Sequence, residues 1–212
     1  MQLTVFGATG GTGRLVVEQA LDTGHDVRAV VRTPAKLPLQ HRNLQIIKAD
    51  VFDPEALKPT LAGADAVISA LGAVGRKDTG QVCANGVRSI LAAMESTGVH
   101  RIAAISAQPV LRSGAGEPLW FRMTVTPVIR AIYRNTYADL ERMEALLADS
   151  AAEWTVLRPP YLTDKPGTGR YRTAFEANVS GSSLTRADLA TALLTVLTDP
   201  GTIRHAIGVG AA

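Results

Sequence analysis

The sequence predicts an α/β fold: a doubly wound parallel sheet with helices on both faces and a small C-terminal lobe on the substrate side. Three observations predict it. Short apolar, β-branched runs alternate with amphipathic helical stretches, the connections between them are short, and no repeat or low-complexity tract interrupts the pattern. Strands that alternate with helices form parallel sheets covered on both faces, and right-handed crossovers wind such a sheet in both directions.

Length and composition favour a single domain. The chain has 212 residues, of which 46% are apolar, which is enough for one sizeable core and short for two. We therefore expect one domain over 1–212, with substrate-side segments at about 107–136 and 159–185.

Composition also excludes several classes of partner and location. The formal net charge is +3 without a run of lysines and arginines, so we expect no nucleic-acid partner. No apolar run approaches the roughly 18 residues that span a bilayer, so we expect no membrane partner. Strand-forming residues begin at Gln2, which leaves no room for a targeting peptide. Cys83 is the only cysteine, which indicates a reducing, cytoplasmic setting, and the histidines stand apart, so we propose no metal.

The first predicted strand, 1–6, runs directly into a glycine-rich turn. The turn reads Gly7-Ala-Thr-Gly-Gly-Thr-Gly13 and opens a helix over 14–21. Gly7 allows a sharp bend off the strand, Gly10 leaves room for a phosphate, and Gly13 lets the helix pack closely. Unpaired amides at the start of that helix favour an anion. The turn therefore predicts a pyrophosphate cradle.

The context of the turn makes it a Rossmann-type motif, and Thr9 and Thr12 belong to the predicted cradle. It follows a strand, opens an amphipathic helix and is followed by a second strand at the right distance. The spacing is G-x-x-G-x-x-G instead of the usual G-x-G-x-x-G. A tight turn without a ligand is the alternative.

The remaining elements continue the alternation. Gly24 and Gly98 close helices before strands, and Asp53 is an N-cap followed by Pro54 at the first helical position. Residues 185–188 resemble a capping box with Asp in place of Glu. We expect strands at 26–31, 44–48, 64–71, 101–105, 154–157 and 203–209, helices at 54–61, 80–97 and 185–197, a short helix at 32–36, and a loop with hairpin content at 167–183.

A long helical stretch is predicted over 119–149, with a break near Pro127. Side chains such as Trp120, Met123 and Val128 make it more apolar than a solvated helix needs. Packing against the sheet edge is the favoured explanation, and a dimer face is the alternative. For the whole protein we expect a monomer or a weak homodimer.

Arg32 is the most informative residue outside the turn. In a doubly wound sheet the ligand crevice lies at the carboxyl ends of the strands, and Arg32 ends the second strand. A protein that binds NAD carries an acidic residue here, which holds the ribose 2′-hydroxyl. Arg32, together with Lys36, is suited to a 2′-phosphate instead. We infer NADP(H) as the cofactor, and a plain surface arginine is the alternative.

Other strand ends supply further candidates. Asp50 would accept a hydrogen bond from the adenine amine, and Val51 would cover its ring; Asp50 as a turn former is nearly as good an interpretation. Ser106 ends the fifth strand, where its hydroxyl would orient the nicotinamide carboxamide or bind the substrate, although a structural role is equally typical. The other strand-end candidates are Leu71, Gly72, Pro159 and Tyr161.

These motifs resemble a known family, the atypical short-chain dehydrogenase/reductases of the NAD(P)H-binding type. The chain most resembles the biliverdin-IX-beta/flavin reductases and, more loosely, the NmrA-like proteins. The resemblance implies NADPH at the positions above and hydride transfer to a planar acceptor stacked on the nicotinamide. It rests on Gly7-Ala-Thr-Gly-Gly-Thr-Gly-Arg14, Val31-Arg32, Ala49-Asp50-Val51, the strand ending in Ser106, residues 157–171 and Leu184-Thr-Arg-Ala-Asp188.

The chain departs from the family in its acid–base residues. Ordinary short-chain dehydrogenases carry Tyr-x-x-x-Lys, whereas here Tyr133 is followed four residues on by Tyr137, and no lysine lies between Lys77 and Lys165. The biliverdin/flavin reductases carry a histidine after the Pro-Pro pair, where this chain has Tyr161. A tyrosine is a poor proton donor at neutral pH, but it can stack on an acceptor or hydrogen-bond to it.

Two functions therefore remain. One is an NADPH-dependent reductase of a small planar conjugated acceptor such as a flavin, a quinone or a biliverdin-like molecule, with the proton coming from solvent. The other is a non-catalytic NADP(H)-binding redox sensor of the NmrA type, which the missing catalytic pair and the apolar stretch 119–133 favour. The absent lysine disfavours an epimerase or dehydratase. Segment 119–134 departs from the reductases and leaves the choice of substrate open.

Overall fold

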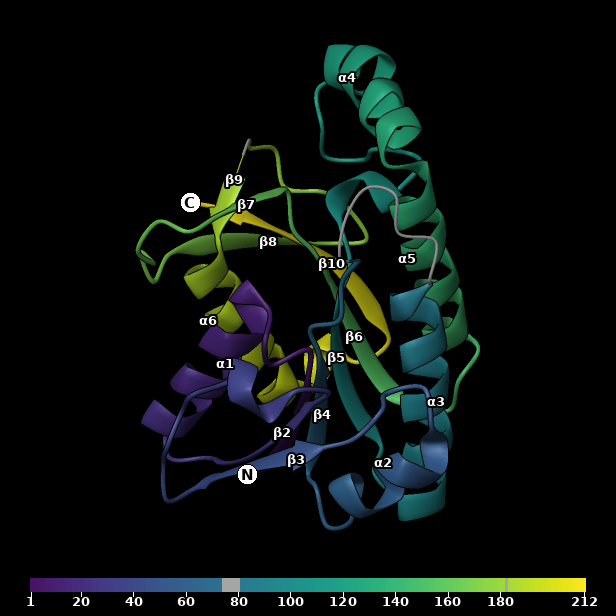
Figure 1. The fold of residues 1–212 in the computed structure, drawn as a ribbon. Helices are drawn as coiled ribbons and strands as arrows, with labels where there is room; N and C mark the ends of the chain where they lie inside the picture. The colour runs from purple at the N-terminus through teal and green to yellow at the C-terminus, as the bar shows by residue number, and fades with distance from the viewer. Residues whose placement is uncertain (74–80, 182) are drawn as a thin grey trace.

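The computed structural model describes residues 1–73, 81–181 and 183–212, and within them an eight-stranded sheet has the order β3-β2-β1-β4-β5-β6-β10-β8. The first seven strands run parallel, and β8 runs antiparallel to β10 at one edge (Figure 1). The strands are β1 (Gln2–Phe6), β2 (Asp26–Val31), β3 (Leu44–Lys48), β4 (Ala66–Ser69), β5 (Arg101–Ile105), β6 (Glu153–Arg158), β8 (Tyr171–Phe175) and β10 (His205–Ala211).

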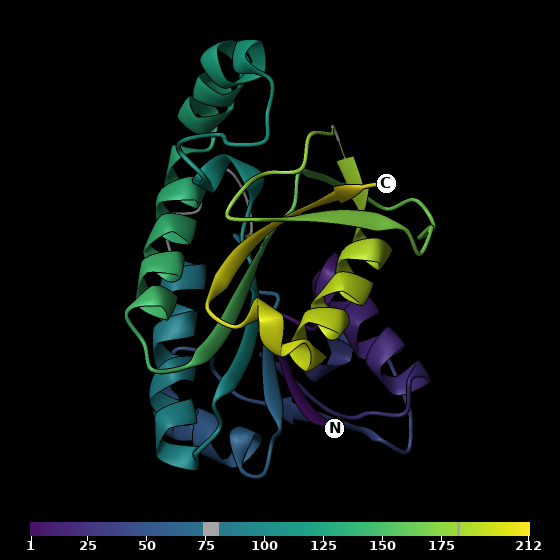
Figure 2. The same cartoon turned by 180° about the vertical axis from the view of Figure 1, so that it is seen from behind.

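The helices cover both faces of this sheet, which confirms the predicted doubly wound α/β class. Helices α1 (Gly11–Asp22) and α6 (Arg186–Thr198) pack together on one face. The other face carries α2 (Pro54–Leu61), α3 (Val82–Thr97) and α5 (Arg134–Ala148) (Figures 1 and 2). The strand order reverses between β1 and β4, and the carboxyl ends of these two strands open the crevice of a doubly wound fold.

Strand β1 shows why the pattern of apolar residues gives this fold. Leu3 and Val5 point into the core beneath α1 and α6, whereas Phe6 belongs to the core beneath α2 and α3. All three side chains are almost completely buried. A strand that is covered on both faces has a continuous run of apolar residues in its sequence. The apolar run at the start of the chain therefore correctly predicted a buried strand.

Side-chain caps fix where the helices begin. The Asp53 carboxylate accepts hydrogen bonds from the first turn of α2, and Thr185 Oγ1 accepts one from Asp188 N at 3.0 Å, which confirms both predicted caps. The start of α3 is capped from a distance, because Asp139 of α5 accepts hydrogen bonds from the Cys83 and Ala84 amides at 3.0 and 2.9 Å. The predicted start of this helix, Gly80, lies outside the described residues.

Segment 167–183 differs from the hairpin that the sequence predicts. Its strand β8 pairs with β10, and the flanking strands β7 (Tyr161–Thr163) and β9 (Ser183–Thr185) pair with each other as a separate parallel ladder. The hairpin prediction relied on neighbours in sequence, whereas β8 covers the sheet edge that β10 would otherwise leave open. The described chain also has short 3-10 turns η1 (Pro34–Lys36), η2 (Gln108–Val110) and η3 (Pro200–Thr202).

Helix α4 (Leu119–Ile132) contradicts two expectations. The long helix breaks at Tyr133, with φ −110° and ψ 30°, and Pro127 lies inside α4. The predicted packing against the sheet edge is wrong: α4 projects beyond the sheet (Figure 1), and Trp120 and Met123 are 65% and 71% exposed. The 3.6-residue period specifies an apolar helix face but not what covers it.

None of the helices in the described ranges is long and apolar enough to cross a bilayer.

Candidate active site

The glycine turn is too tight for side chains at two of its positions. Gly7 has φ +76°, and a Cβ there would lie 2.3 Å from Ala70 O. A Cβ on Gly13 would lie 2.2 Å from Gly7 O. Between them, the Gly10 amide donates to Gly7 O at 2.9 Å and closes the turn. The turn therefore brings the start of α1 directly against the ends of β1 and β4.

The start of α1 is suited to an anion. Gly10 is the N-cap, no side chain caps it, and the first turn of the helix has no acidic residue. The first amides of a helix have no carbonyl partner within it, and the helix dipole places partial positive charge there. A phosphate group at this position would receive hydrogen bonds that the helix itself leaves unmade.

A cavity of about 400 Å³, the first cavity, opens in front of this turn. It lies where the carboxyl ends of β1, β2, β3 and β4 meet. Of the residues predicted from the sequence, its lining contains Gly7, Thr9, Gly10, Arg32, Lys36, Val51, Leu71 and Gly72.

The basic pair lies at the end of this cavity that β2 and η1 form. Arg32 directly follows β2, Lys36 ends η1, and both side chains are exposed and line the first cavity. Val51 lies on the neighbouring wall and is buried. The cavity thus combines a helix start, an apolar wall and two cations, which fits a dinucleotide.

Three predicted residues lie close to the first cavity without lining it. Thr12 is buried within the first turn of α1, and Gly13 packs beneath Gly7. Asp50 is exposed, and its Oδ1 accepts a hydrogen bond from the Phe52 amide at 3.0 Å. This bond is the turn-forming role that the sequence left open for Asp50, and it fixes Phe52 at the cavity.

Phe52 is a lining residue that sequence reasoning missed. It is 41% exposed although it is a phenylalanine, and it lines the first cavity beside Val51. The sequence could have indicated Phe52 as a site residue, because it directly follows the Asp50-Val51 pair at a strand end. An exposed aromatic ring there is positioned to stack on an adenine.

A second cavity of about 590 Å³ lies on the side of the predicted substrate segments. Pro159 and Tyr161, two of the predicted residues, line it, and Tyr161 is 76% exposed. The other wall comes from α4, the start of α5 and η2, so both segments, 107–136 and 159–185, contribute. The aromatic side chains in the lining are Phe121, Tyr133, Tyr137 and Tyr161.

Two titratable groups of the second cavity, Tyr137 and Glu117, are shifted toward their neutral forms. Burial raises the pKa of Tyr137, and the neighbouring Tyr133 adds to the shift. Burial also raises the pKa of Glu117, against hydrogen bonds from Asn178 Nδ2 at 3.1 Å and Thr126 Oγ1 at 3.4 Å. The lining also contains the cation Arg186. A cavity with so aromatic a lining is suited to a flat conjugated molecule.

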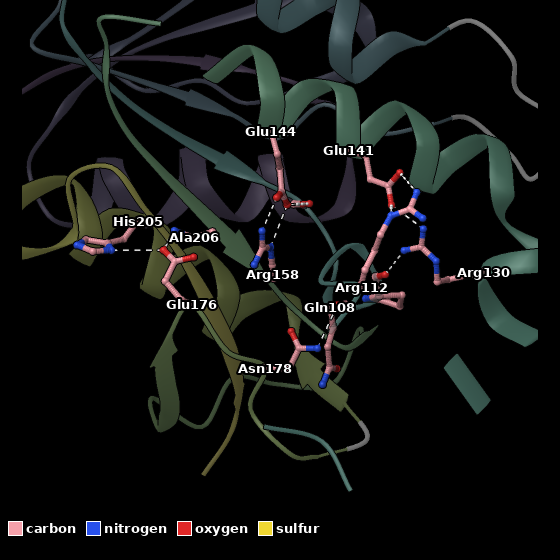
Figure 3. A network of polar contacts seen from close by, with 12 residues as sticks. Gln108, Arg112, Arg130, Glu141, Glu144, Arg158, Glu176, Asn178, His205 and Ala206 are labelled. Atoms are coloured by element: carbon pink, nitrogen blue, oxygen red, sulfur yellow. Dashed lines mark hydrogen bonds and ion pairs between the residues drawn. The ribbon is translucent and has the colours of Figure 1, made fainter. Parts of the chain in front are cut away.

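The Ser106 hydroxyl is hydrogen-bonded to α5. Its Oγ donates to Glu144 Oε1 at 2.5 Å, and the same carboxylate pairs with Arg158 Nη2 at 2.5 Å (Figure 3). The linings of the two cavities do not include Ser106. The structure thus gives this hydroxyl the structural role that the sequence left open, because α5 brings Glu144 to the end of β5.

A second ionic cluster anchors α4. Glu141 of α5 accepts from Arg112 Nη2 at 2.8 Å and from Arg130 Nη2 at 2.5 Å, and Arg130 also donates to Pro109 O (Figure 3). Burial opposes the charge of Glu141, but these hydrogen bonds and charges outweigh it and lower its pKa. The cluster fixes the last turn of α4 and leaves its first turns projecting.

A family model described as NAD(P)H-binding matches residues 7–200. The chain belongs to the NAD(P)H-binding family. The match begins at the glycine turn and includes both cavities, so family membership and geometry point to the same part of the molecule.

The chain is also similar to individual relatives and solved structures. The uncharacterized protein YwnB of Bacillus subtilis is 28% identical to this chain. The alignment spans 214 positions and covers 94% of this chain and 93% of YwnB. A solved structure from Streptococcus pneumoniae, named as a candidate NADH-flavin reductase, is 25% identical with a TM-score of 0.81 and full coverage of both chains. A Veillonella parvula short-chain dehydrogenase/reductase in complex with NADP has a TM-score of 0.82 at 18% identity, covering 99% of this chain and 94% of its own. This last likeness supports the Rossmann-type fold alone.

Proposed function

We propose that this NAD(P)H-binding protein is an NADPH-dependent reductase that transfers hydride to a planar conjugated acceptor, such as a flavin, a quinone or a biliverdin-like molecule. The observation that carries the proposal is the second cavity, whose aromatic lining adjoins Pro159 and Tyr161 at the carboxyl end of the sheet. The Streptococcus pneumoniae structure named for NADH-flavin reduction supports this class of acceptor.

The first cavity would hold the cofactor. The amides at the start of α1 would bind the pyrophosphate, Val51 and Phe52 would enclose the adenine, and Arg32 with Lys36 would pair with the 2′-phosphate. These residues fit the group, because the turn has no room for a Cβ at its closest approach and α1 begins without an acid. When bound, the nicotinamide supplies a hydride from its C4.

The chain's own residues would bind and orient the acceptor. Phe121, Tyr137 and Tyr161 offer ring faces and edges to a flat molecule, and Pro159 and Pro160 form a rigid wall at the sheet. Positioning two reactants in this way is the main contribution of a protein to hydride transfer between preformed rings. The exposure of Tyr161 leaves the site open to water, which can deliver the proton to the reduced acceptor.

A purified-protein assay with NADPH tests this proposal. Oxidation of NADPH is followed by its absorbance with FMN, FAD, quinones and biliverdin in turn. We expect saturable turnover with at least one acceptor, faster with NADPH than with NADH. Tight NADPH binding without turnover of any acceptor would contradict the reductase.

One observation favours a second function, an NADP(H)-binding sensor of the NmrA type. Leu119, Trp120, Met123, Val128 and Ile132 of α4 are all more than half exposed, which is unusual for so many large apolar side chains on one helix. So many exposed apolar side chains are typical of a protein contact. Failure of every acceptor in the assay above, with cofactor binding intact, would favour this function.

A further inference from the structure

Arg186 is a cation of the second cavity whose side chain also lies against the glycine turn. It is the first residue of α6 and belongs to the lining of the second cavity. A Cβ built on Gly11 would lie 2.9 Å from Arg186 Cδ and 3.0 Å from its Nε. The guanidinium stem therefore crosses the first residue of α1.

This contact accounts for a glycine that the cofactor turn leaves unexplained. Gly7, Gly10 and Gly13 already provide the sharp bend, the phosphate approach and the close helix packing. Gly11 has an ordinary helical backbone, yet a side chain there would displace Arg186. The glycine at position 11 therefore leaves the space through which the Arg186 side chain reaches the turn.

The backbone of Arg186 is held firmly in this position. Thr185 caps α6, and the Asp188 carboxylate binds the Thr168 and Gly169 amides at 2.9 and 2.8 Å. Gln19 of α1 donates to Ala187 O at 3.0 Å and so joins the two helices beside the arginine. The side chain starts from a fixed point against α1.

The Arg186 guanidinium lies beside a helix start of the same sign, and its ion-pair partner is an exposed carboxylate. A cation beside the N-terminus of a helix opposes the helix dipole, and α1 supplies no acidic residue in its first turn to offset it. Arg186 Nη1 pairs with Asp164 Oδ1 at 2.8 Å, but the Asp164 side chain is 87% exposed. An ion pair to so exposed a carboxylate contributes little and exchanges readily.

We propose that Arg186 is a pyrophosphate-binding residue of the cofactor site, which exchanges its pair with Asp164 for the dinucleotide when the cofactor binds. The ligand is the diphosphate common to NADPH and NADH, so Arg186 contributes affinity without choosing between them. This inference rests on the proposed cofactor site but not on turnover. From the same position Arg186 also closes the second cavity on the side of the turn.

The test is dinucleotide binding by Arg186→Gln, measured by titration calorimetry without any acceptor. We expect NADPH, NADH and ADP-ribose to bind roughly 10- to 100-fold more weakly than to the wild type, because each loses a charge-assisted hydrogen bond. Arg142→Gln removes the same charge from the exposed surface of α5 and should bind all three like the wild type. Thermal unfolding of both variants checks that the fold is kept.

Asp164→Asn tests the exchange with an exposed residue that the fold does not need. Removing the competing carboxylate should tighten NADPH and NADH binding by roughly two- to fivefold. Unchanged or weaker binding would contradict the exchange. Binding of NADPH and ADP-ribose to Arg186→Gln within twofold of the wild type would overturn the pyrophosphate contact, as would weakening of NADPH alone with ADP-ribose unaffected.

These outcomes separate the inference from the proposed function. If the wild type binds dinucleotides but reduces no acceptor, the reductase fails while Arg186 is still tested by affinity. If the wild type binds no dinucleotide at all, both fail. If it binds them and Arg186→Gln binds them equally, only the role of Arg186 fails.

Discussion

Arg32 lies at the end of β2 with an exposed side chain that lines the first cavity. Substitution by alanine should weaken NADPH binding by roughly 10- to 100-fold and leave NADH within about threefold, because only NADPH carries the 2′-phosphate. Titration of both cofactors against both proteins measures the difference. Equal losses for NADPH and NADH would show that Arg32 does not read the 2′-phosphate.

Tyr161 lies on the wall of the second cavity, and most of its side chain is exposed. We expect Tyr161→Phe to keep kcat/KM for the acceptor within about threefold, because the ring stacks and solvent supplies the proton. Tyr161→Ala should lower kcat/KM roughly tenfold through the loss of stacking. A large loss in the Phe variant alone would assign the hydroxyl a part in the chemistry.

Ser106, Glu144 and Arg158 form one buried polar cluster. Glu144→Ala leaves the Arg158 guanidinium buried without its carboxylate and should lower the free energy of unfolding by about 3–5 kcal/mol. Ser106→Ala should cost only about 1 kcal/mol. Urea unfolding measures both values.

Two controls distinguish a structural Ser106 from the predicted catalytic one. Glu144→Leu combined with Arg158→Met should regain part of the lost stability, since no charge is left unpaired. Ser106→Ala should keep kcat if the hydroxyl serves only Glu144. A tenfold or larger fall in kcat with stability retained would restore the contact with nicotinamide or substrate that the sequence suggested.

The sequence correctly predicted the position of a residue where the order of the strands along the chain determines that position. Gly7, Arg32 and Val51 follow strands whose carboxyl ends must share one edge, so their meeting in the first cavity was foreseeable. The contact between Ser106 and Glu144 was not foreseeable, because Glu144 comes from a helix 38 residues later in the chain. Nothing in the order of strands indicates which way a side chain turns at a strand end.

At the scale of elements, Glu117 joins the loop before α4 to Asn178 and to α4 itself. Its pKa is raised by burial, so the folded state holds the proton more tightly than the unfolded state does. The free energy of unfolding therefore falls as pH rises from the unfolded pKa through the folded pKa. Glu117→Gln should gain stability relative to the wild type over this window and keep a constant advantage above it.

Glu141→Gln is the matched control for this pH dependence. The pKa of Glu141 is lowered, so its contribution to stability is present above the unfolded pKa and is lost as pH falls through the folded pKa. The variant should be less stable at neutral pH, with the difference shrinking on acidification. Urea unfolding at a series of pH values between about 3 and 8 compares the two. Slopes of the same sign for both variants would contradict this assignment.

The elements that the sequence predicted wrongly share a physical cause. The helix of α4 and the hairpin content of 167–183 were predicted from local patterns, but their partners were not. Helix α4 leaves its apolar side chains exposed, and β8 pairs with β10. The spacing of apolar residues and the residue types in the turns indicate which face of a helix or strand is apolar. What covers that face depends on contacts distant in sequence.

At the scale of the whole molecule, the doubly wound class was predictable, because strands that alternate with helices form a parallel sheet and right-handed crossovers wind it in both directions. The first cavity is therefore assembled from the ends of four strands that arise from separate parts of the chain. A ligand bound there contacts elements of both helical layers, through the turn that begins α1 on one face and through Leu71 beside α3 on the other. Binding should stabilise the native fold as a unit.

We expect NADPH at about one hundred times its Kd to raise the free energy of unfolding by about 2.7 kcal/mol, which is a rise in Tm of roughly 5–10 °C for a chain of this size. At equal concentrations NADH should give a smaller rise in the wild type, because it lacks the 2′-phosphate that Arg32 and Lys36 would bind. In Arg32→Ala the two cofactors should give nearly equal rises, since the distinguishing contact is gone. Differential scanning fluorimetry across a range of cofactor concentrations measures all four curves. Equal stabilisation of the wild type by NADH and NADPH would show that Arg32 and Lys36 do not select the 2′-phosphate. The first cavity would then recognise only the part of the dinucleotide that NADH and NADPH share.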